Sequence, residues 1–554
     1  MRPCSVVSLV ALIQAGDSLA DTVFYNWNVT WVWASPDGFG RPVVGINDQW
    51  PCPMVEASVG DTIVISLENQ LGNQTTGLHF HGIDQIDTNF MDGAAGTNQC
   101  PVPPGHTVTY SFMANRAGTY WYHSHNGIQY PDGLRGPLLI HDPDDPYVGS
   151  YDQDVVITVT DWYHEQTATL VSQMLQPSNT QHAPPQADGI LVNEGGDGLI
   201  PIEAGKTYRM RIINFAALTA AFVDFGPYDM EIIMIDASFV QKQTARQLHI
   251  AAAQRYDVLI TGNDDTTQNS PILFALDTNP DFTSKTPIQP VAFHWNLTGG
   301  LVKDASAGIS QRAIAQIFEP YDDAQLKDYG NTPAFGPVTK QWVLNFDYCT
   351  DANGYPRACF NSTTFIDQKV PTLYSAASLG DNNTEVEAYG QINAFTVGYG
   401  EVLEIVINNH DVAIHPFHLH GHQFQVLQRP FSDAGDWTGA TTVPDAPPRR
   451  DTITVYANSH AVLRIVADNP GVYLFHCHVE WHVAMGLTAT LIEAPEKLVN
   501  YQIPQDFVDA CDMMDIPTTG NAAGNAQWYD TAGFITVPPT TWIGQVIPEP
   551  ISYR

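Results

Sequence analysis

Short apolar segments with a strand-like pattern recur along the whole chain. Residues 155–160 (Val-Val-Ile-Thr-Val-Thr) and 452–455 (Thr-Ile-Thr-Val) are two examples, both rich in β-branched side chains. The 42 glycines and 39 prolines supply frequent turns. Because long amphipathic patterns of helical period are scarce, the sequence predicts an all-β protein built from Greek-key β-sandwiches.

The pattern also contains an internal repeat. Residues 118–125 match residues 471–478, and a strand-like segment at 61–65 matches one at 401–405. These matches indicate that the first and last parts of the chain are the same structural unit, used twice. Residues 206–214 repeat the strand pattern between them, but without the paired histidines of the outer units.

A chain of 554 residues is long enough for three domains of ordinary size. We predict domains at residues 21–148, 149–320 and 321–554, the last with a C-terminal tail. The first boundary falls near the polar run at 141–151. The second lies within 305–336, a stretch that can hold a long linker.

Residues 1–20 are typical of a signal peptide. Arg2 precedes an apolar run at 6–13, and Ser18-Leu19-Ala20 offers small residues for cleavage. Neither this run nor any later one is apolar enough to span a membrane. Five Asn-x-Ser/Thr sequons begin at Asn28, Asn73, Asn296, Asn361 and Asn382. We expect a monomeric glycoprotein, secreted to the cell wall or medium.

The formal net charge of −36 restricts the partners. Nucleic acids and anionic membranes require a basic surface, so neither is expected as a partner. The charge favours cationic or neutral substrates and an acidic working medium.

The seven cysteines divide by position. Cys4 belongs to the predicted signal peptide. Cys349 and Cys359 are close enough for a local disulfide, and Cys100 with Cys511 would pin the first domain to the tail. Cys52 is left over, as a predicted buried thiol.

The remaining cysteine carries the most informative motif, His476-Cys477-His478, with His482 four residues later. On a strand, Cys477 faces one side and both flanking histidines face the other. A thiolate on one face and imidazoles on the other can hold two metal centres joined by a few covalent bonds. A cysteine with two histidines is the blue-copper arrangement.

Three further His-x-His pairs complete the ligand set, at His79 and His81, His123 and His125, and His418 and His420. His415 precedes the last pair by three residues. Ten histidines and one cysteine satisfy four copper ions. A blue copper would take Cys477, His415 and His482, and a three-copper cluster the other eight histidines. We interpret the remaining histidines, including His422, as surface or structural residues.

These motifs resemble those of the multicopper oxidases, specifically fungal laccases and the related fungal iron-oxidising enzymes. The resemblance covers nearly the whole mature chain and is strongest at 78–82, 121–125, 415–421 and 476–482. It implies three cupredoxin-like domains, with the blue (type 1) copper in the third and the trinuclear cluster between the first and third. It also matches Cys100 and Cys511 to a laccase disulfide.

The resemblance assigns roles to individual residues. His79 and His418 would hold a type 2 copper. Two type 3 coppers would be held by His81, His123, His125, His420, His476 and His478. Leu487 stands at the axial position of the blue copper and cannot ligate it, which is expected to raise the potential. Asp92 and Glu480 match proton donors for O₂ reduction, a step that consumes protons.

The substrate is less well defined by the sequence. Asp188, before the strand-like 189–193, matches the acid with which laccases bind phenols. The iron oxidases carry a glutamate a few residues earlier, and it is absent from 183–186. A second acid of the iron oxidases is retained as Asp411. These features favour electron transfer from phenols or aromatic amines to O₂, giving water. The alternatives are an Fe²⁺ oxidase and a non-catalytic copper carrier, which would need no O₂ site.

Overall fold

The computed structural model describes residues 9–10, 20–195, 199–264, 269–277, 296–302 and 319–540. The predicted signal peptide therefore lies almost wholly outside the described residues. Residues 303–318, which include part of the predicted second boundary region, also lie outside the described residues.

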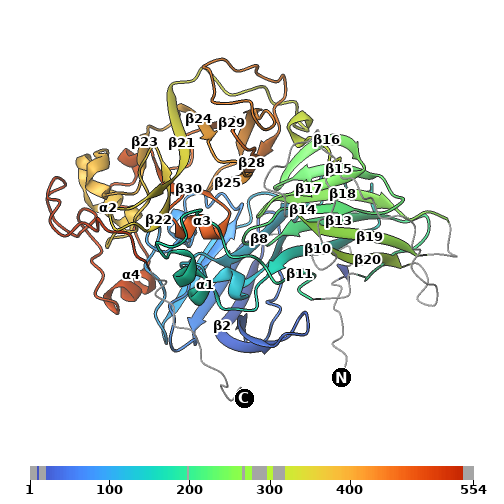
Figure 1. Ribbon diagram of the computed structural model, residues 1–554, viewed down its shortest axis with the longest axis horizontal. Helices are drawn as coiled ribbons and strands as arrows, with labels where there is room; N and C mark the ends of the chain where they lie inside the picture. The colour runs from blue at the N-terminus through green and yellow to red at the C-terminus, as the bar shows by residue number, and fades with distance from the viewer. Residues whose placement is uncertain are drawn as a thin grey trace.

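Strands dominate the described chain and form six sheets, stacked as three sandwiches. Figure 1 shows the first sandwich in blue, the middle one in green, and the third in yellow to orange. The prediction of an all-β protein with three consecutive cupredoxin-like domains is confirmed. The residue limits of the domains stay a prediction.

The first sandwich pairs two four-stranded sheets, ordered β3-β2-β5-β7 and β4-β9-β8-β6. Their strands are β2 (Thr22–Ala34), β3 (Arg41–Ile46), β4 (Val55–Ser58), β5 (Thr62–Asn69), β6 (Leu78–His81), β7 (Thr107–Met113), β8 (Gly118–Ser124) and β9 (Arg135–His141).

The middle sandwich has a seven-stranded and a five-stranded sheet. The first contains β1 (Leu9–Val10), β10 (Gln153–Trp162), β11 (Gly189–Val192), β13 (Thr207–Asn214), β15 (Met230–Ile235), β16 (Ser238–Ala245) and β18 (Arg255–Thr261). The second contains β12 (Leu199–Pro201), β14 (Ala221–Asp224), β17 (Gln247–Ile250), β19 (Ser270–Leu276) and β20 (Asn296–Val302).

The third sandwich has a six-stranded and a five-stranded sheet. The first contains β21 (Lys340–Thr350), β22 (Pro356–Phe360), β24 (Val402–Asn409), β26 (Phe424–Gln428), β27 (Arg449–Arg450) and β29 (Ser459–Val466). The second contains β23 (Ala394–Val397), β25 (His415–Leu419), β28 (Thr452–Val455), β30 (Gly471–Cys477) and β31 (Thr488–Glu493).

Four α-helices are described: α1 (Thr167–Met174), α2 (Thr372–Ser378), α3 (Glu480–Ala484) and α4 (Gln505–Asp512). The described residues also form short 3₁₀ turns at Asn89–Met91, Tyr130–Asp132, Asp323–Gln325, Gly380–Asn382, Val386–Tyr389 and Pro495–Lys497. None of the described helices has the length and apolar character needed to cross a bilayer.

The repeat predicted from the sequence appears as one pairing scheme in all three sandwiches. The first long strand pairs in parallel with a later one: β2 with β5, β10 with β13, and β21 with β24. The later strand then pairs antiparallel with β7, β18 or β29. The middle sandwich is therefore a third copy of the unit.

The later strand of each parallel pair, β5, β13 or β24, ends in a buried asparagine: Asn69, Asn214 or Asn409. The side-chain amide donates to main-chain carbonyls of the following loops, and the side-chain oxygen accepts the main-chain N–H two residues ahead. The loop is thereby fastened to the sandwich. In the outer sandwiches this loop leads into the strand that carries the first histidine motif.

Candidate metal centres and the cavity beside them

Strand register brings the His-x-His motifs together in pairs. In the first sandwich β6 and β8 are antiparallel, with His79 opposite His123. In the third, β25 and β30 are antiparallel, with His418 opposite His476. Directly opposed residues share a face of the sheet, so each sandwich presents a cluster of imidazoles.

The two clusters meet because the first and third sandwiches are fastened together nearby. Asn89 and Asn98 of the first both donate side-chain hydrogen bonds to the carbonyl of Val472, at 3.1 and 2.9 Å. The carboxylate of Asp92 lies 2.8 Å from Nδ1 of His420.

Eight buried or half-buried histidines line this junction in three geometric groups. Their ligand-capable atoms lie within 4.8 Å of one another in each group. The groups are His79, His81 and His418; His81, His123 and His478; and His125, His420 and His476. The last two are the type 3 sets expected from the resemblance, and the first contains the expected type 2 pair.

The electrostatics of the junction suit a metal cluster. Burial, and then the neighbouring imidazoles, lower the pKa of most of these histidines, to about 3 for His478 and about 4 for His420. Neutral imidazole is the form that binds metals. Nε2 of His79, His123 and His418 and Nδ1 of His81 are buried without a hydrogen-bond partner, which leaves them available as ligands. The residues present therefore fit the copper cluster.

A fourth group lies on the opposite face of β30. Sγ of Cys477 lies 3.7 Å from Nδ1 of His415 and 3.6 Å from Nδ1 of His482. Burial raises the pKa of this thiol, with partial relief from the Val479 N–H, so a bound cation is needed to favour the thiolate. Leu487 is fully buried and its carbonyl accepts from the Cys477 N–H, in keeping with a non-ligating axial neighbour.

Two acids near the cluster have pKa values that are shifted in opposite directions. Burial would raise the pKa of Asp92, but the charges and hydrogen bonds of His420 and His79 outweigh it, so the pKa is lowered. Glu480, the first residue of α3, is buried, and desolvation alone raises its pKa well above the usual value. The lowered pKa favours the anion at Asp92, and the raised pKa favours the neutral acid at Glu480.

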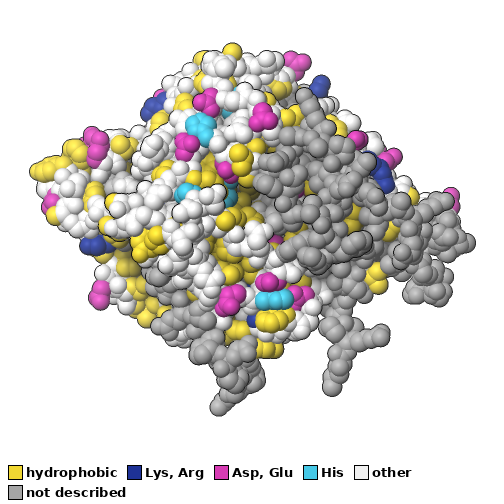
Figure 2. Space-filling view, in the orientation of Figure 1, with side chains coloured by type: hydrophobic (Ala, Val, Ile, Leu, Met, Phe, Trp, Pro, Cys, Tyr) yellow, Lys and Arg dark blue, Asp and Glu magenta, His cyan; other side chains and the backbone are white. Residues whose placement is uncertain are grey.

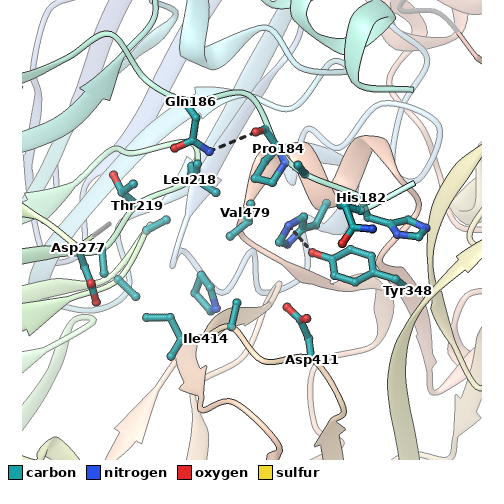
Figure 3. Close-up of a pocket in the computed structure, with 18 residues that line it drawn as sticks. His182, Pro184, Gln186, Leu218, Thr219, Asp277, Tyr348, Asp411, Ile414 and Val479 are labelled. Atoms are coloured by element: carbon teal, nitrogen blue, oxygen red, sulfur yellow. Dashed lines mark hydrogen bonds between the residues drawn. The ribbon is translucent and has the colours of Figure 1, made fainter. Parts of the chain in front are cut away.

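A cavity of about 300 Å³ opens beside the Cys477 group. Figure 3 shows its lining, with Asp411 and Asp277 on different sides. Apolar walls come from Leu218, Ala251, Ala252, Ile414, Pro416 and Val479, and the polar lining includes Gln181, His182, Gln186, Thr219, Asp277, Tyr348, Asp411 and His482.

β21 supplies the contacts between this cavity and the copper-site histidines. Phe346 packs edge-on against His415 with ring centroids 4.6 Å apart, and the hydroxyl of Tyr348 lies 2.9 Å from Nε2 of His482. Two residues apart, they share a face of the strand. His182 stacks on Tyr348 at 4.9 Å, and its Nε2 lies 2.9 Å from the Cys349 carbonyl.

Asp411 is the predicted acid that the structure brings into this cavity. Oδ2 of Asp411 lies 2.9 Å from Nε2 of His415. Burial raises the pKa of Asp411, but the hydrogen bond and charge of His415 outweigh burial and lower it. Asp277, which follows β19, also lines the cavity and lies 2.9 Å from Nε2 of His249.

Asp188 is not among the residues that line the cavity. Its Oδ2 accepts the main-chain N–H of His164 at 2.8 Å, which joins the start of β11 to the segment that follows β10. Asp277, Tyr348 and His182 were not expected from the sequence. None belongs to a motif, and each comes to the cavity through the packing of distant strands and loops.

The cysteines pair as the sequence predicts. Disulfides join Cys100 to Cys511 and Cys349 to Cys359. Cys52 is buried and free. His422, interpreted as structural, lies 2.9 Å from the buried Glu493 and belongs to none of the four groups.

Comparison with known proteins agrees with this geometry. Family models described as multicopper oxidase match residues 28–145, 153–289 and 365–497. The iron transport multicopper oxidase fetC of Epichloe festucae is 43% identical over 96% of this chain and 87% of its own. The iron transport multicopper oxidase FET3 of Gibberella zeae is 40% identical over 95% of this chain and 85% of its own.

Solved structures give the same result. The crystal structure of Fet3p, titled a multicopper oxidase that functions in iron import, matches with a TM-score of 0.88 and 33% identity over 94% of this chain and 99% of that one. The crystal structure of the laccase from Botrytis aclada matches with a TM-score of 0.71 and 25% identity over 90% of this chain and 93% of that one. With candidate ligand groups that fit four copper ions, this chain belongs to the multicopper oxidase family, whose members pass electrons from a reducing substrate to O₂.

Proposed function

We propose that the reducing substrate of this enzyme is Fe²⁺, so that the protein is a ferroxidase. The observation that carries the proposal is the carboxylate of Asp411, which lines the cavity and also contacts the ligand His415. This reverses the order of preference drawn from the sequence, where phenols came first. The relatives named as iron transport oxidases support the same choice.

Charge favours a cation in this cavity. Asp411 and Asp277 are both among its lining residues, and carboxylate and imidazole groups are ligands that suit Fe²⁺. The whole chain carries a formal charge of −36, and acidic side chains are spread over the face shown in Figure 2. Such a surface raises the local concentration of cations.

Tyr348 disfavours a phenol. His482 is the copper-site histidine that lines the cavity, and the Tyr348 hydroxyl already occupies the hydrogen-bonding position of its Nε2 at 2.9 Å. A phenol that approached His482 would have to displace this hydroxyl. A cation bound at Asp411 would not, because its contact to the copper site runs through His415.

Different residues of the protein would serve electron delivery and proton delivery. The ligand groups described above would hold copper, which would supply one-electron acceptance from the substrate and four-electron reduction of O₂. Asp411 would bind Fe²⁺ and place it one hydrogen bond from His415. Four Fe²⁺ become four Fe³⁺, while one O₂ and four protons become two waters. Glu480 would hold a proton for this step, and Asp92 would orient His420.

Oxidation of phenols or aromatic amines remains a second candidate. The cavity, at about 300 Å³, has the size of a small-molecule site, and much of its wall is apolar.

The proposed location is extracellular, which the two disulfides support.

The test is O₂ uptake with Fe²⁺ and with a diphenol, measured for the native enzyme and for Asp411→Asn. Loss of a charge-assisted contact should lower kcat/KM for Fe²⁺ by roughly ten- to a hundredfold. Asp188→Asn is the matched control, because it removes the same charge outside the cavity lining. A native enzyme that turns over the diphenol faster than Fe²⁺, or equal losses in both variants, would contradict the proposal.

A further inference from the structure

The middle sandwich supplies no residue to the four ligand groups in the described chain, yet one of its side chains reaches the trinuclear site. Arg255, the first residue of β18, is fully buried. Its Nη1 and Nη2 donate to the two carboxylate oxygens of Asp451, at 2.8 and 2.6 Å. Its Nε donates to the carbonyl of Thr119 at 3.0 Å. One guanidinium therefore joins all three sandwiches.

Asp451 in turn contacts one ring nitrogen of each of two candidate copper ligands. Its main-chain carbonyl lies 2.8 Å from Nδ1 of His418, and its Oδ1 lies 3.2 Å from Nε2 of His81. The other nitrogen of each ring, Nε2 of His418 and Nδ1 of His81, is buried and has no protein partner. The hydroxyl of Thr452, which donates to Oδ1 of Asp451, lies 3.3 Å from the same two nitrogens that Asp451 contacts. Asp451 and Thr452 together therefore leave the opposite nitrogen of each ring for the metal.

The guanidinium is itself held in place. Its Nη1 also donates to the carbonyl of Ala253 at 3.2 Å and lies 3.7 Å from Oδ1 of Asp236. Asp236 is fixed in turn by the main-chain N–H of Arg255 at 2.8 Å and by Nε of Arg450 at 2.7 Å. The planar fork of an arginine fixes both the position and the plane of the carboxylate it binds, which a lysine cannot do.

Gly82 gives independent evidence that the neighbouring chain leaves no room for a side chain beside this ion pair. Gly82 directly follows His81 and has φ +91°. A Cβ at this position would lie 2.5 Å from Nη2 of Arg255 and 2.8 Å from Oδ2 of Asp451. Any larger residue would force the pair apart, so the chain at His81 is shaped around the Arg255–Asp451 contact.

We propose that Arg255 is a positioning residue of the trinuclear copper site. By fixing Asp451, it orients His418 and His81 and so holds the type 2 copper in place. The middle sandwich then contributes to O₂ reduction without binding copper. The inference does not depend on which reducing substrate the enzyme uses.

The test compares Arg255→Met and Arg255→Lys with the native protein after reconstitution with copper. Copper per chain is measured together with the electron paramagnetic resonance signals of type 1 and type 2 copper, so that type 1 copper serves as an internal reference. Loss of a residue behind a metal ligand typically weakens metal binding by about 10–100-fold. We expect Arg255→Met to lose or shift the type 2 signal and keep the blue band. Arg255→Lys should be intermediate.

Arg209→Met is the matched control. Arg209 is equally buried, lies on β13 of the same sheet, and pairs with Asp257 at 2.7 Å. In the described part of the chain, neither Arg209 nor Asp257 hydrogen-bonds to a copper-site histidine. The Arg209→Met protein should therefore lose stability but keep four coppers and an unchanged type 2 signal.

Two results would overturn the inference: an unchanged type 2 signal in Arg255→Met, or the same copper loss in Arg209→Met. If Arg255→Met does not fold, Arg255→Lys decides by the same two measurements. A native type 2 signal in a folded Arg255→Lys protein would then show that the bidentate contact to Asp451 is not needed.

Discussion

The hydroxyl of Tyr348 lies 2.9 Å from Nε2 of His482, and both residues line the cavity beside the copper site. Tyr348 is held there from both sides. His182 stacks on its ring, and Cys349, the next residue, is bridged to Cys359 across the β21–β22 hairpin. The side chain is therefore a fixed part of the copper-site wall.

Removing this wall should change substrate choice. Tyr348→Ala opens space over His482, so kcat/KM for a diphenol should rise while that for Fe²⁺ changes little or falls. Tyr348→Phe removes only the hydrogen bond, worth about 0.5–1.5 kcal/mol, and should raise diphenol oxidation by roughly two- to tenfold. Steady-state O₂ uptake with both substrates checks this. A fall in diphenol oxidation in both variants would show that Tyr348 assists phenols.

The ligand assignment at the blue copper has a simple spectroscopic test. Cys477→Ser removes the thiolate responsible for the intense blue absorption and should abolish both the colour and substrate oxidation. The eight histidines of the trinuclear site are untouched, so the other three coppers should stay bound. A blue band that persists in this variant would exclude Cys477 as the ligand.

The three equivalent asparagines allow one substitution to be compared in three domains. Asn69→Ala, Asn214→Ala and Asn409→Ala each remove buried hydrogen bonds and should each cost on the order of 2–4 kcal/mol of stability. Asn69 and Asn409 precede histidine motifs, so their variants should also bind less copper. Asn214→Ala should keep four coppers. Thermal unfolding and metal analysis separate the two effects, and equal copper loss in all three would refute the distinction.

Cys52 gives a prediction about pH. Burial raises the pKa of its thiol from 9.0 to about 12. The unfolded chain then releases this proton at lower pH than the folded one, so the contribution of Cys52 to stability is present below pH 9 and declines between pH 9 and about 12. Cys52→Ala should flatten the decline in this window. Thiol reagents should label Cys52 only after unfolding, and rapid labelling of the native protein would contradict its burial.

The copper site was predictable because its ligands lie in short contiguous motifs whose strand geometry fixes their faces. His476, Cys477 and His478 define two metal centres by alternation alone. The repeat likewise located the outer sandwiches, and its weak copy at 206–214 located the middle one. The register of β6 on β8 and of β25 on β30 then assembles the motifs as expected.

The residues that no motif marks were not predictable. Asp277 and Tyr348 reach the cavity from β19 and β21, whose separation in sequence hides their closeness in space. Arg255 and Asp451 are 196 positions apart and meet only because the middle and third sandwiches pack together. Asp188 is the converse case: its local sequence fits a substrate acid, but its carboxylate accepts the main-chain N–H of His164 and it is not among the cavity-lining residues.

The disulfide between Cys100 and Cys511 spans 411 residues, and the trinuclear ligands come from the same two distant regions. At roughly 5–20 residues per second, synthesis of the intervening chain takes about 20–80 s. Throughout that interval the first sandwich exists with half a copper cluster and an unpaired Cys100. The complete trinuclear site can therefore form only once the third sandwich has been made, and burial of Cys52 in the folded first sandwich hinders its pairing with Cys100.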